Sequence, residues 1–368
     1  MIAMGKVGLA VLIAAAAAIA AAPCTRAAEE KVLNVYNWSD YIADNTLAAF
    51  TARTGIKVNY DVYDSNEILD AKLLAGRSGY DLVFPTATPW FARQIKAGAY
   101  RKLDRSKIAN WTLVDPKVMD RLKVADPENA YGLPYMMAGT GIGYNIALVK
   151  KTMPDAPIGS LAMILDPKTL AKLQGCGVTV LDTVEEVFPA ALAFVGRDPL
   201  STAQADMDMS AKVLTAARPF WRYTHSSTYI NDLANGATCV AMGYAGDLVQ
   251  ARARAREAKR GVEIGIFLPK EGTTFNIDVM AVPKDAPHPE NAQLFIDFIL
   301  EPQTIAKITN KIGYANAVPG SRPFIRPDLL ADPAVSPPAD AKLHMLPLVS
   351  DTFERARNRA WNRIKARR

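Results

Sequence analysis

The sequence is poor in the residues on which most metalloenzymes and hydrolases depend. Its 368 residues include only three cysteines and three histidines, and the histidines do not stand at zinc-ligand spacing from the cysteines. A GxSxG nucleophile elbow and a GxxxxGK phosphate loop are both missing. The segment "GTGIGY" (139–144) has Tyr144 where a dinucleotide fingerprint needs its last glycine. We therefore expect neither an enzyme nor a cofactor.

Long hydrophobic runs are also missing after residue 30, where no stretch reaches the roughly 18 apolar residues that a membrane-spanning helix needs. The one long run, from Val7 to Ala22, follows Lys6 and precedes small residues and a polar region that leads to Glu29. This arrangement is typical of a secretory signal peptide. We predict that residues 1–28 are removed on export, with an N-terminal membrane anchor as the alternative.

Export favours a disulfide between cysteines of the mature chain, because disulfides persist in oxidising compartments. Cys24 lies in the predicted signal peptide, and Pro23 directly before it disfavours a lipid anchor there. Cys176 and Cys239 remain, and two cysteines in an exported protein usually pair. Two buried free thiols are the alternative. A bridge would close a loop of more than sixty residues and stabilise the fold by roughly 4 kcal/mol through chain entropy.

An excess of positive charge is concentrated at the C-terminus. The chain has 43 basic and 37 acidic residues and a formal net charge of +6, but its last sixteen residues hold seven basic residues and one acid. No aromatic-basic module accompanies them, and we expect no nucleic-acid partner. Apolar residues in this tail recur at helical spacing and predict an amphipathic helix with one docked face and a solvated arginine face; they are Phe353, Ala356, Ala360, Trp361 and Ile364.

The sequence after the signal peptide alternates between strand-like and helix-like segments. Patterns of the order β, α, β, α and β follow one another at 31–38, 42–55, 56–64, 66–76 and 80–87. This order predicts an α/β lobe with a largely parallel sheet. Ligands of such sheets bind beyond the carboxyl ends of the strands, where "YNWSDY" (36–41) and "FPTATP" (84–89) lie.

A second α/β region begins near residue 138, and no long flexible linker separates it from the first. A further strand at 276–283 and one or two helices at 288–313 follow it. The sequence therefore predicts two lobes between which the chain crosses more than once. We place lobe 1 at 29–137 and 273–320, and lobe 2 at 138–272 and 321–368.

Nine segments spread over the chain agree in order and spacing with one known family. They are "NVYNWSDYI" (34–42), "GIKVNYDVYDSNEIL" (55–69), "YDLVFPTA" (80–87), "TGIGYN" (140–145), "CGVTVLDTVEEVF" (176–188), "HSSTYINDLANGATCVAMGYAGD" (225–247), "PKEG" (269–272), "IDVMAVPKDA" (277–286) and "GYANA" (313–317). The chain resembles the periplasmic polyamine-binding proteins of bacterial ABC importers, and most closely the putrescine-binding members. The resemblance implies a type II, two-lobe binding-protein fold that closes on a ligand, and a Cys176–Cys239 bridge.

The resemblance also implies a ligand pocket at twelve positions. The chain departs from the family at two of them, because Tyr244 stands where the family has tryptophan and Asn276 stands where it has an aromatic residue. Strand alternation makes Asn276 point with Asp278, whereas a one-residue bulge would bring Phe275 there instead. The twelve positions are Trp38, Ser39, Asp40, Tyr41, Thr86, Glu186, Ser226, Tyr244, Asp247, Asn276, Asp278 and Tyr314.

These residue types suit a diamine, which carries an ammonium at each end of an apolar chain. Burying an unpaired ammonium costs several kcal/mol, and carboxylates at both ends offset that cost. Aromatic faces cover the methylenes and attract the cations, by about 0.5–2 kcal/mol for each good contact. Asp278 is the most telling position, because aspartate is depleted inside strands and costly to bury unpaired. Glu186 supplies a further carboxylate, with Glu185 as the register alternative.

Several positions also have a purely structural explanation. Asp40 and Asp247 are residues of the type that caps a following helix. Trp38 and Tyr314 are of the type that fills a core.

From the residues and the resemblance together we predict a monomeric, periplasmic solute-binding protein. It captures a polyamine, putrescine foremost, and delivers it to an ABC transporter permease in the inner membrane. The alternatives are a different cationic amine (agmatine, cadaverine or spermidine), a ligand sensor with the same fold and, remotely, an exported hydrolase.

Overall fold

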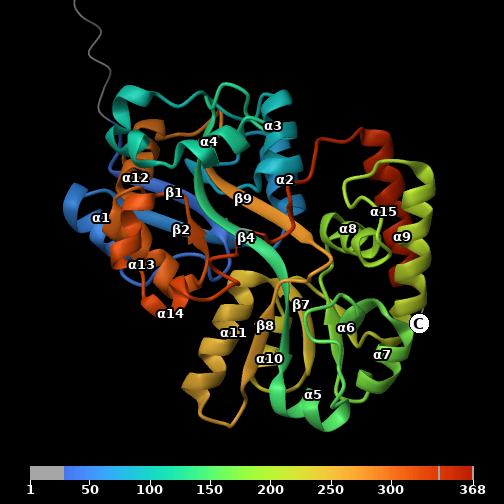
Figure 1. Ribbon diagram of the computed structural model, residues 1–368. Coiled ribbons are helices and arrows are strands. Elements are labelled where there is room, and N and C mark those ends of the chain that lie inside the picture. Colours follow the sequence, from blue (N-terminus) through green and yellow to red (C-terminus); the bar gives the residue numbers. More distant parts are fainter. Residues whose placement is uncertain (1–28, 339, 367–368) are drawn as a thin grey trace, which may run out of the picture.

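Two α/β lobes share one extended sheet in the computed structural model, which describes residues 29–338 and 340–366 (Figure 1). The predicted signal peptide, 1–28, lies outside the described residues. In the described ranges, no helix is both long enough and apolar enough to cross a membrane. The strands of the main path are ordered β2-β1-β3-β9-β4-β7-β5-β6.

The first lobe begins with the predicted βαβαβ unit. β1 (Val32–Trp38) lies between β2 (Lys57–Tyr63) and β3 (Leu82–Val83), and all three run parallel. α1 (Thr46–Thr54) and α2 (Asn66–Leu74) form the crossovers. α1 begins later than predicted, because Asn45 before it has a left-handed φ of 64°. It ends as predicted at Gly55, whose φ of 72° is one that glycine adopts at little cost.

β3 is much shorter than the predicted 80–87, since only Leu82 and Val83 pair as a strand. The following residues turn into a short helical segment at Ala87–Phe91. The lobe is completed by α3 (Ala92–Lys96), α4 (Pro116–Leu122), α12 (Pro289–Ile299), α13 (Pro302–Ile312) and β10 (Ala315–Asn316). The predicted helical region at 288–313 is therefore two helices.

Two long strands connect the lobes. β4 (Gly132–Asn145) pairs with β9 (Thr273–Ala281) along its first half and with β7 and β8 along its second half. β9 brings the chain back from the second lobe to pair with β3. The chain therefore crosses between the lobes more than once, as predicted.

The second lobe has its own mixed sheet and a shell of helices. Its strands are β5 (Val178–Val180), β6 (Tyr223–Thr224), β7 (Val240–Tyr244) and β8 (Ile264–Phe267). Its helices are α5 (Ile146–Thr152), α6 (Ala162–Leu165), α7 (Pro167–Leu173), α8 (Val184–Phe194), α9 (Gln204–Ala217), α10 (Tyr229–Ala234) and α11 (Ala245–Ala258). The chain continues through α14 (Pro327–Leu330) and β11 (Leu343–His344).

The two larger of the three hydrophobic clusters in the described residues match this division. One combines buried residues from Leu33 to Met136 with others from Phe275 to Val318. The other combines buried residues from Ile142 to Ile264 with residues near the C-terminus. The exact residues at which one lobe gives way to the other stay a prediction.

The expected disulfide is present in the second lobe. Cys176 and Cys239 are bonded; their Cα atoms are 5.4 Å apart, and the two residues are separated by 63 positions in the sequence. Cys176 precedes β5 and Cys239 precedes β7, which are parallel neighbours in the sheet. The bridge therefore fixes the N-terminal ends of two paired strands.

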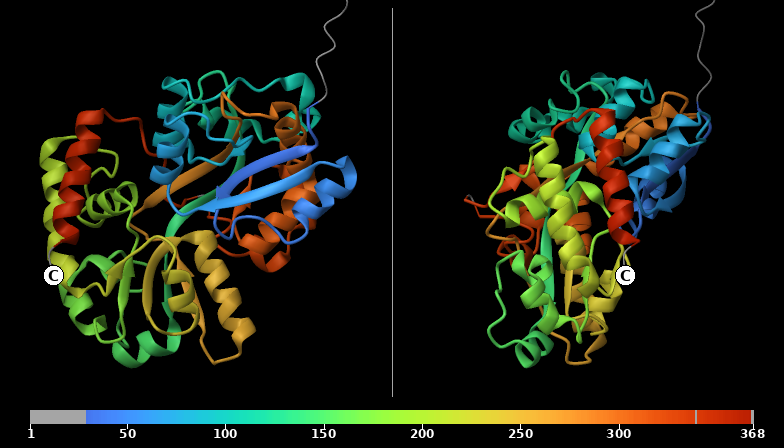
Figure 2. Two further views of the ribbon diagram at one scale, coloured as in Figure 1. Left: turned by 180° about the vertical axis from the view of Figure 1, so that it is seen from behind. Right: turned by 90° about the vertical axis from the view of Figure 1, so that its right-hand side faces the viewer.

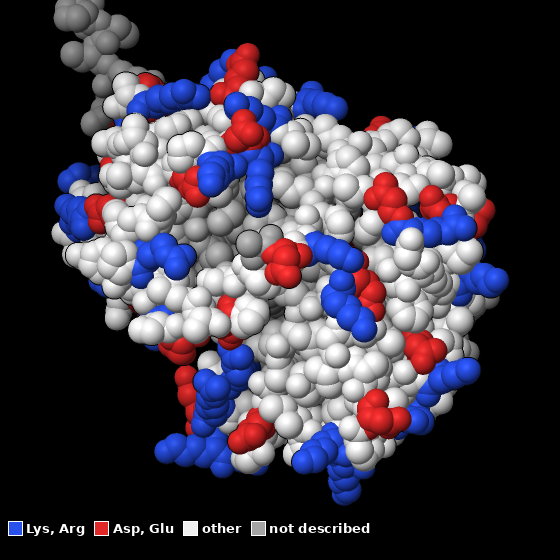
Figure 3. Space-filling view, in the orientation of Figure 1, with Lys and Arg blue, Asp and Glu red and all other residues white. Residues whose placement is uncertain are grey.

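The predicted C-terminal helix is confirmed as α15 (Asp351–Lys365), which lies along α9 and α8 (Figure 2). Ala360, Trp361 and Ile364 are buried in the second core. Two charged residues on this helix, Glu354 and Arg357, are buried as well, which the amphipathic pattern did not predict. Figure 3 shows basic and acidic side chains interspersed over one face of the molecule, rather than a single field of positive charge.

Candidate ligand-binding pocket

A pocket of about 870 Å³, including the part open to solvent, is lined by residues of both lobes. It is lined by the segments after β1 and β3, by α8, by the start of α11 and by β9. All twelve positions singled out from the sequence line it: Trp38, Ser39, Asp40, Tyr41, Thr86, Glu186, Ser226, Tyr244, Asp247, Asn276, Asp278 and Tyr314. Their contact with a ligand stays a prediction.

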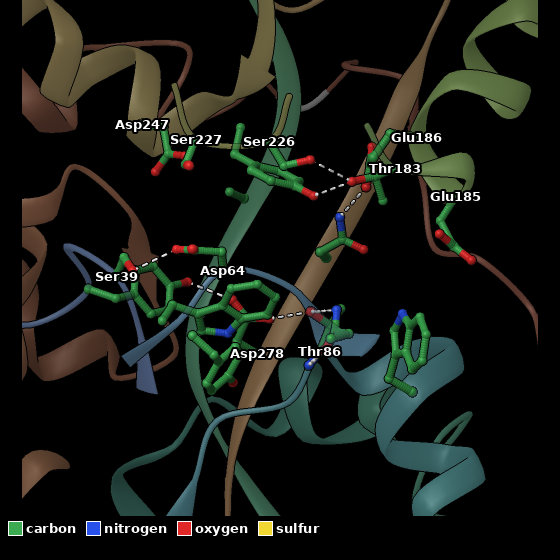
Figure 4. Close-up of a pocket in the computed structure, with 18 of the residues that line it drawn as sticks. Ser39, Asp64, Thr86, Thr183, Glu185, Glu186, Ser226, Ser227, Asp247 and Asp278 are labelled. Carbon is green, nitrogen blue, oxygen red and sulfur yellow. Dashed lines mark hydrogen bonds between the residues drawn. The ribbon is translucent and has the colours of Figure 1, made fainter. Parts of the chain in front are cut away.

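Asp278 lies on β9 at the floor of the pocket (Figure 4). Its carboxylate accepts hydrogen bonds from the Tyr41 hydroxyl at 2.6 Å and from the Thr86 hydroxyl at 2.7 Å. Burial raises the pKa of Asp278 to about 6, although both hydrogen bonds oppose the shift. Because Tyr41 follows β1 and Thr86 follows β3, the parallel sheet itself brings these donors to Asp278.

Asp247 lies in the first turn of α11 and is held from both lobes. It accepts hydrogen bonds from Tyr229 at 2.7 Å and from Tyr314 at 2.8 Å. Tyr229 belongs to the core of the second lobe, whereas Tyr314 belongs to the core of the first. Burial raises the pKa of Asp247 to about 6. Asp247 does not cap α11, whose N-cap residue is Tyr244.

The two adjacent glutamates at the start of α8 have different surroundings. Glu186 accepts hydrogen bonds from Thr140 at 2.6 Å, from Asn276 at 2.8 Å and from Thr274. Glu185 is paired with Arg357 of α15 at 3.0 Å. In Figure 4, Glu185 lies beyond Glu186, on the side away from Asp247. Both glutamates line the pocket, but Glu186 is the one connected to β9.

The side chains of β9 alternate regularly between the two faces of the strand at Asn276, where the chain departs from the family. Asn276 and Asp278 both line the pocket. Phe275 points elsewhere and lines a different cavity, where the Arg121 guanidinium lies 5.9 Å from its ring centre. The irregularity in this strand pair falls between Pro134 and Met136 of β4. The bulge that would have brought Phe275 into the pocket is therefore not formed.

Asp40, like Glu185, already has a cationic partner. Its side chain is 55% exposed, and it pairs with Arg254 of α11 at 3.0 Å. The pair connects the segment after β1 in the first lobe to a helix of the second. Asp40 does not cap α1, whose N-cap residue is Asn45.

The remaining predicted residues form the aromatic and hydroxyl parts of the wall. The Trp38 indole donates to the Phe84 carbonyl at 2.7 Å, which fixes the ring at the edge of the pocket. Ser226 is 3.0 Å from the Thr183 hydroxyl, and the Tyr244 hydroxyl is 3.5 Å from the same group. Thr183 was not predicted from the sequence.

Two further lining residues, Tyr63 and Asp64, were not predicted, although their place at the end of a strand indicates them. Tyr63 ends β2 and Asp64 follows it; because β2 is the parallel neighbour of β1, both reach the same sheet edge as Trp38 and Ser39. Asp64 accepts a hydrogen bond from Ser39 at 2.8 Å. Trp90 carried no comparable signal, because it lies in an irregular segment whose path depends on tertiary packing.

The chemistry of the pocket is strongly one-sided. Six of the described lining residues are acidic and none is basic; the acids are Asp40, Asp64, Glu185, Glu186, Asp247 and Asp278. Six more are aromatic: Trp38, Tyr41, Tyr63, Trp90, Tyr244 and Tyr314. Within the described part of the chain, no group of three or more His, Cys, Asp or Glu residues is placed to hold a metal ion. The arrangement therefore suits an organic cation.

Comparison with known proteins identifies the family to which the chain belongs. A sequence model of the bacterial extracellular solute-binding proteins matches residues 45–337. The chain belongs to this family. Two curated relatives of this solute-binding protein extend the match over nearly the whole sequence.

The first relative, the putrescine-binding periplasmic protein PotF of Escherichia coli (strain K12), is 45% identical and covers 100% of both chains. The second, the putrescine-binding periplasmic protein SpuD of Pseudomonas aeruginosa (strain UCBPP-PA14), is 44% identical over 96% of this chain and 97% of its own. A solved structure assigned to a spermidine/putrescine ABC transporter of Listeria monocytogenes superposes with a TM-score of 0.82 at 25% identity. It covers 92% of this solute-binding protein and 100% of its own chain, and it supports the type II binding-protein fold.

Proposed function

We propose that this solute-binding protein captures a polyamine, with putrescine preferred, and delivers it to an ABC transporter permease. The protein acts as a monomer in the periplasm, is exported through a signal peptide at residues 1–28, and binds its ligand without converting it. The observation that carries the proposal is a set of pocket carboxylates, the buried Glu186 and the half-buried Asp247 and Asp278, which form no ion pair in the described part of the chain. The names of the curated relatives support the same ligand class.

The positions of the carboxylates suit a cation at each end of a short chain. Asp247 lies on one side of the pocket and Glu186 on the other, with Asp278 between and below them (Figure 4). An ammonium at either end finds acceptors, and its burial cost is offset there. Aromatic side chains from both lobes cover the methylenes between the ammonium groups and attract the cations.

Lobe closure supplies the mechanism of capture. The ligand contacts residues of both lobes, so its binding free energy favours the closed arrangement over the open one. Tyr314 of the first lobe already donates to Asp247 of the second. A ligand at Asp247 and Asp278 joins the same two lobes.

Calorimetric titration of the ligand-free protein tests the ligand class. Residues 29–368 are expressed, stripped of co-purified ligand by unfolding and refolding, and titrated at neutral pH with putrescine, cadaverine, agmatine, spermidine and spermine. We expect micromolar or tighter binding of putrescine. The matched control is 1,4-butanediol, which has the same length without the charges and is expected not to bind. Absence of heat with every amine, from protein shown to be folded by circular dichroism, would overturn the proposal.

Delivery to a permease is tested separately from binding. Cells that lack this gene should lose uptake of labelled putrescine and regain it when the gene is restored. A sensor with the same pocket would bind putrescine in the calorimeter but leave uptake unchanged on deletion. That result would retain the ligand and overturn the transport role.

A further inference from the structure

A second, smaller cavity of about 330 Å³ adjoins the ligand pocket near the start of α8. Pro89 lines both cavities. Glu185 lines the ligand pocket, and Arg357 of α15 lines the smaller cavity. The ion pair between these two side chains therefore stands at the boundary of the two spaces.

The pair is enclosed on both sides. Arg357 Nη2 lies 3.0 Å from Glu185 Oε1, and the two side chains are only 7% and 8% exposed. Glu185 Oε2 and Arg357 Nε have no hydrogen-bond partner among the described residues, so the contact between the two groups is the one from Nη2 to Oε1. Burial raises the pKa of Glu185 to about 7, although the Arg357 charge opposes the shift.

The position of Arg357 is fixed by its helix. Its guanidinium lies 5.5 Å from the centre of the Phe353 ring, and Phe353 packs against the second core. One turn away, Glu354 is paired with Arg93 of the first lobe. The C-terminal helix thus brings a cation from outside the pocket to a carboxylate that lines it.

On the basis of the polyamine-binding function proposed above, we propose that the Glu185–Arg357 ion pair is the end wall of the pocket and sets the length of amine that it accepts. A diamine held between Asp247, Asp278 and Glu186 ends before this wall. A triamine carries a further aminopropyl arm, and the carboxylate that would receive its third cation is already occupied by the Arg357 guanidinium. Arg357 is thus a residue that determines specificity without contacting the diamine.

Removing the guanidinium should change the length preference rather than abolish binding. Methionine at position 357 keeps an unbranched, buried side chain but leaves Glu185 without its internal cation. The loss of the guanidinium also opens the boundary toward the smaller cavity. Both changes favour a ligand that brings its own third ammonium.

The experiment compares wild type, Arg357→Met, Arg357→Lys and the double variant Glu185→Gln/Arg357→Met, each titrated with putrescine and spermidine. The measured quantity is the ratio of the spermidine Kd to the putrescine Kd. We expect this ratio to exceed one in wild type and to fall by tenfold or more in Arg357→Met. Arg357→Lys keeps the cation and should stay within about threefold of wild type. The double variant lacks the carboxylate and should show no gain for spermidine.

Several outcomes would refute the proposal that the Glu185–Arg357 pair is the end wall of the pocket. These are an unchanged ratio in folded Arg357→Met that still binds putrescine, tighter binding of spermidine than putrescine by wild type, or an equal gain in the lysine or double variant. If Arg357→Met does not fold, the double variant carries no buried charge at this site, and a tenfold gain for spermidine in it would still refute the role of Glu185. Failure of wild type to bind any amine would instead refute the proposed function.

Discussion

At the scale of single residues, the pocket depends on buried and half-buried carboxylates that have no cationic partner among the described residues. Asp278 is the clearest of these, because it lies in the interior of a strand and its hydrogen-bond donors among the described residues are the hydroxyls of Tyr41 and Thr86. An asparagine amide has the same shape but only one acceptor oxygen, so it can accept one of these two hydrogen bonds and offers an NH2 donor to the other hydroxyl. It does not offset the charge of an ammonium.

We therefore predict that Asp278→Asn weakens putrescine binding by at least tenfold, which corresponds to about 1.4 kcal/mol or more. Calorimetric titration measures the change. The matched control is Asp120→Asn, which removes an exposed carboxylate that is paired with Lys123 far from the pocket and should leave the Kd unchanged. An unaltered Kd in Asp278→Asn would refute the role assigned to this residue.

The sequence identified the residues that line the pocket better than it identified their partners. Asp278 could be found because a strand interior disfavours aspartate. The cations beside Asp40 and Glu185 could not be found in the same way. Arg357 is 172 positions away from Glu185 in the chain, and although its spacing from Phe353 and Trp361 places it on the docked face of α15, no local pattern identifies its partner. Such contacts follow from packing rather than periodicity.

At the scale of helices and strands, prediction is again limited to what local periodicity shows. The βαβαβ unit could be predicted because each strand and helix has its own periodicity and α1 ends at a glycine. The bounds of β4 were harder to predict, because its residues are almost all buried in one lobe or the other and give no alternation of apolar and polar side chains. The predicted second region accordingly begins at residue 138, in the middle of this strand.

The strands and helices around Asp247 allow a comparison of two hydrogen bonds to one carboxylate. Tyr229 of α10 donates from the same lobe, whereas Tyr314, just after α13, donates across the cleft. A hydrogen bond to a charged group contributes about 1.5–3 kcal/mol. Tyr229→Phe and Tyr314→Phe each remove one such bond, but only the second also removes a link between the lobes.

We predict that both variants weaken putrescine binding by roughly tenfold or more, since 1.4 kcal/mol is already a tenfold change. Only Tyr314→Phe should also shift the ligand-free molecule toward separated lobes, which small-angle X-ray scattering detects as a larger radius of gyration. Tyr229→Phe is the matched control and should scatter like wild type. Identical radii for all three proteins would show that the Tyr314–Asp247 bond does not hold the lobes together.

At the scale of the whole molecule, the buried acids link ligand binding, stability and pH. The pKa values of Asp247 and Asp278 are about 6 in the folded protein, above the ordinary value of 3.8, because burial disfavours the charged form. A group whose pKa is raised by folding stabilises the protein at low pH, and this contribution is lost as the pH rises through about 6. The ligand-free protein therefore holds two carboxylates at neutral pH whose charge its own fold does not compensate.

A bound dication reverses this balance, because it interacts only with the ionised forms. The ammonium groups of putrescine stay charged from pH 5 to 7.5. At pH 5 each aspartic acid must lose its proton before it pairs, which weakens binding by about tenfold for each group that lies one pH unit below its pKa. We predict that the putrescine Kd rises by roughly a hundredfold from pH 7.5 to pH 5, as measured by calorimetry. In Asp278→Asn one of the two titrating groups is gone, so the same pH change should raise the Kd by only about tenfold. A wild-type Kd that changes by less than about threefold over this range would mean that these two carboxylates do not hold the ligand's charges.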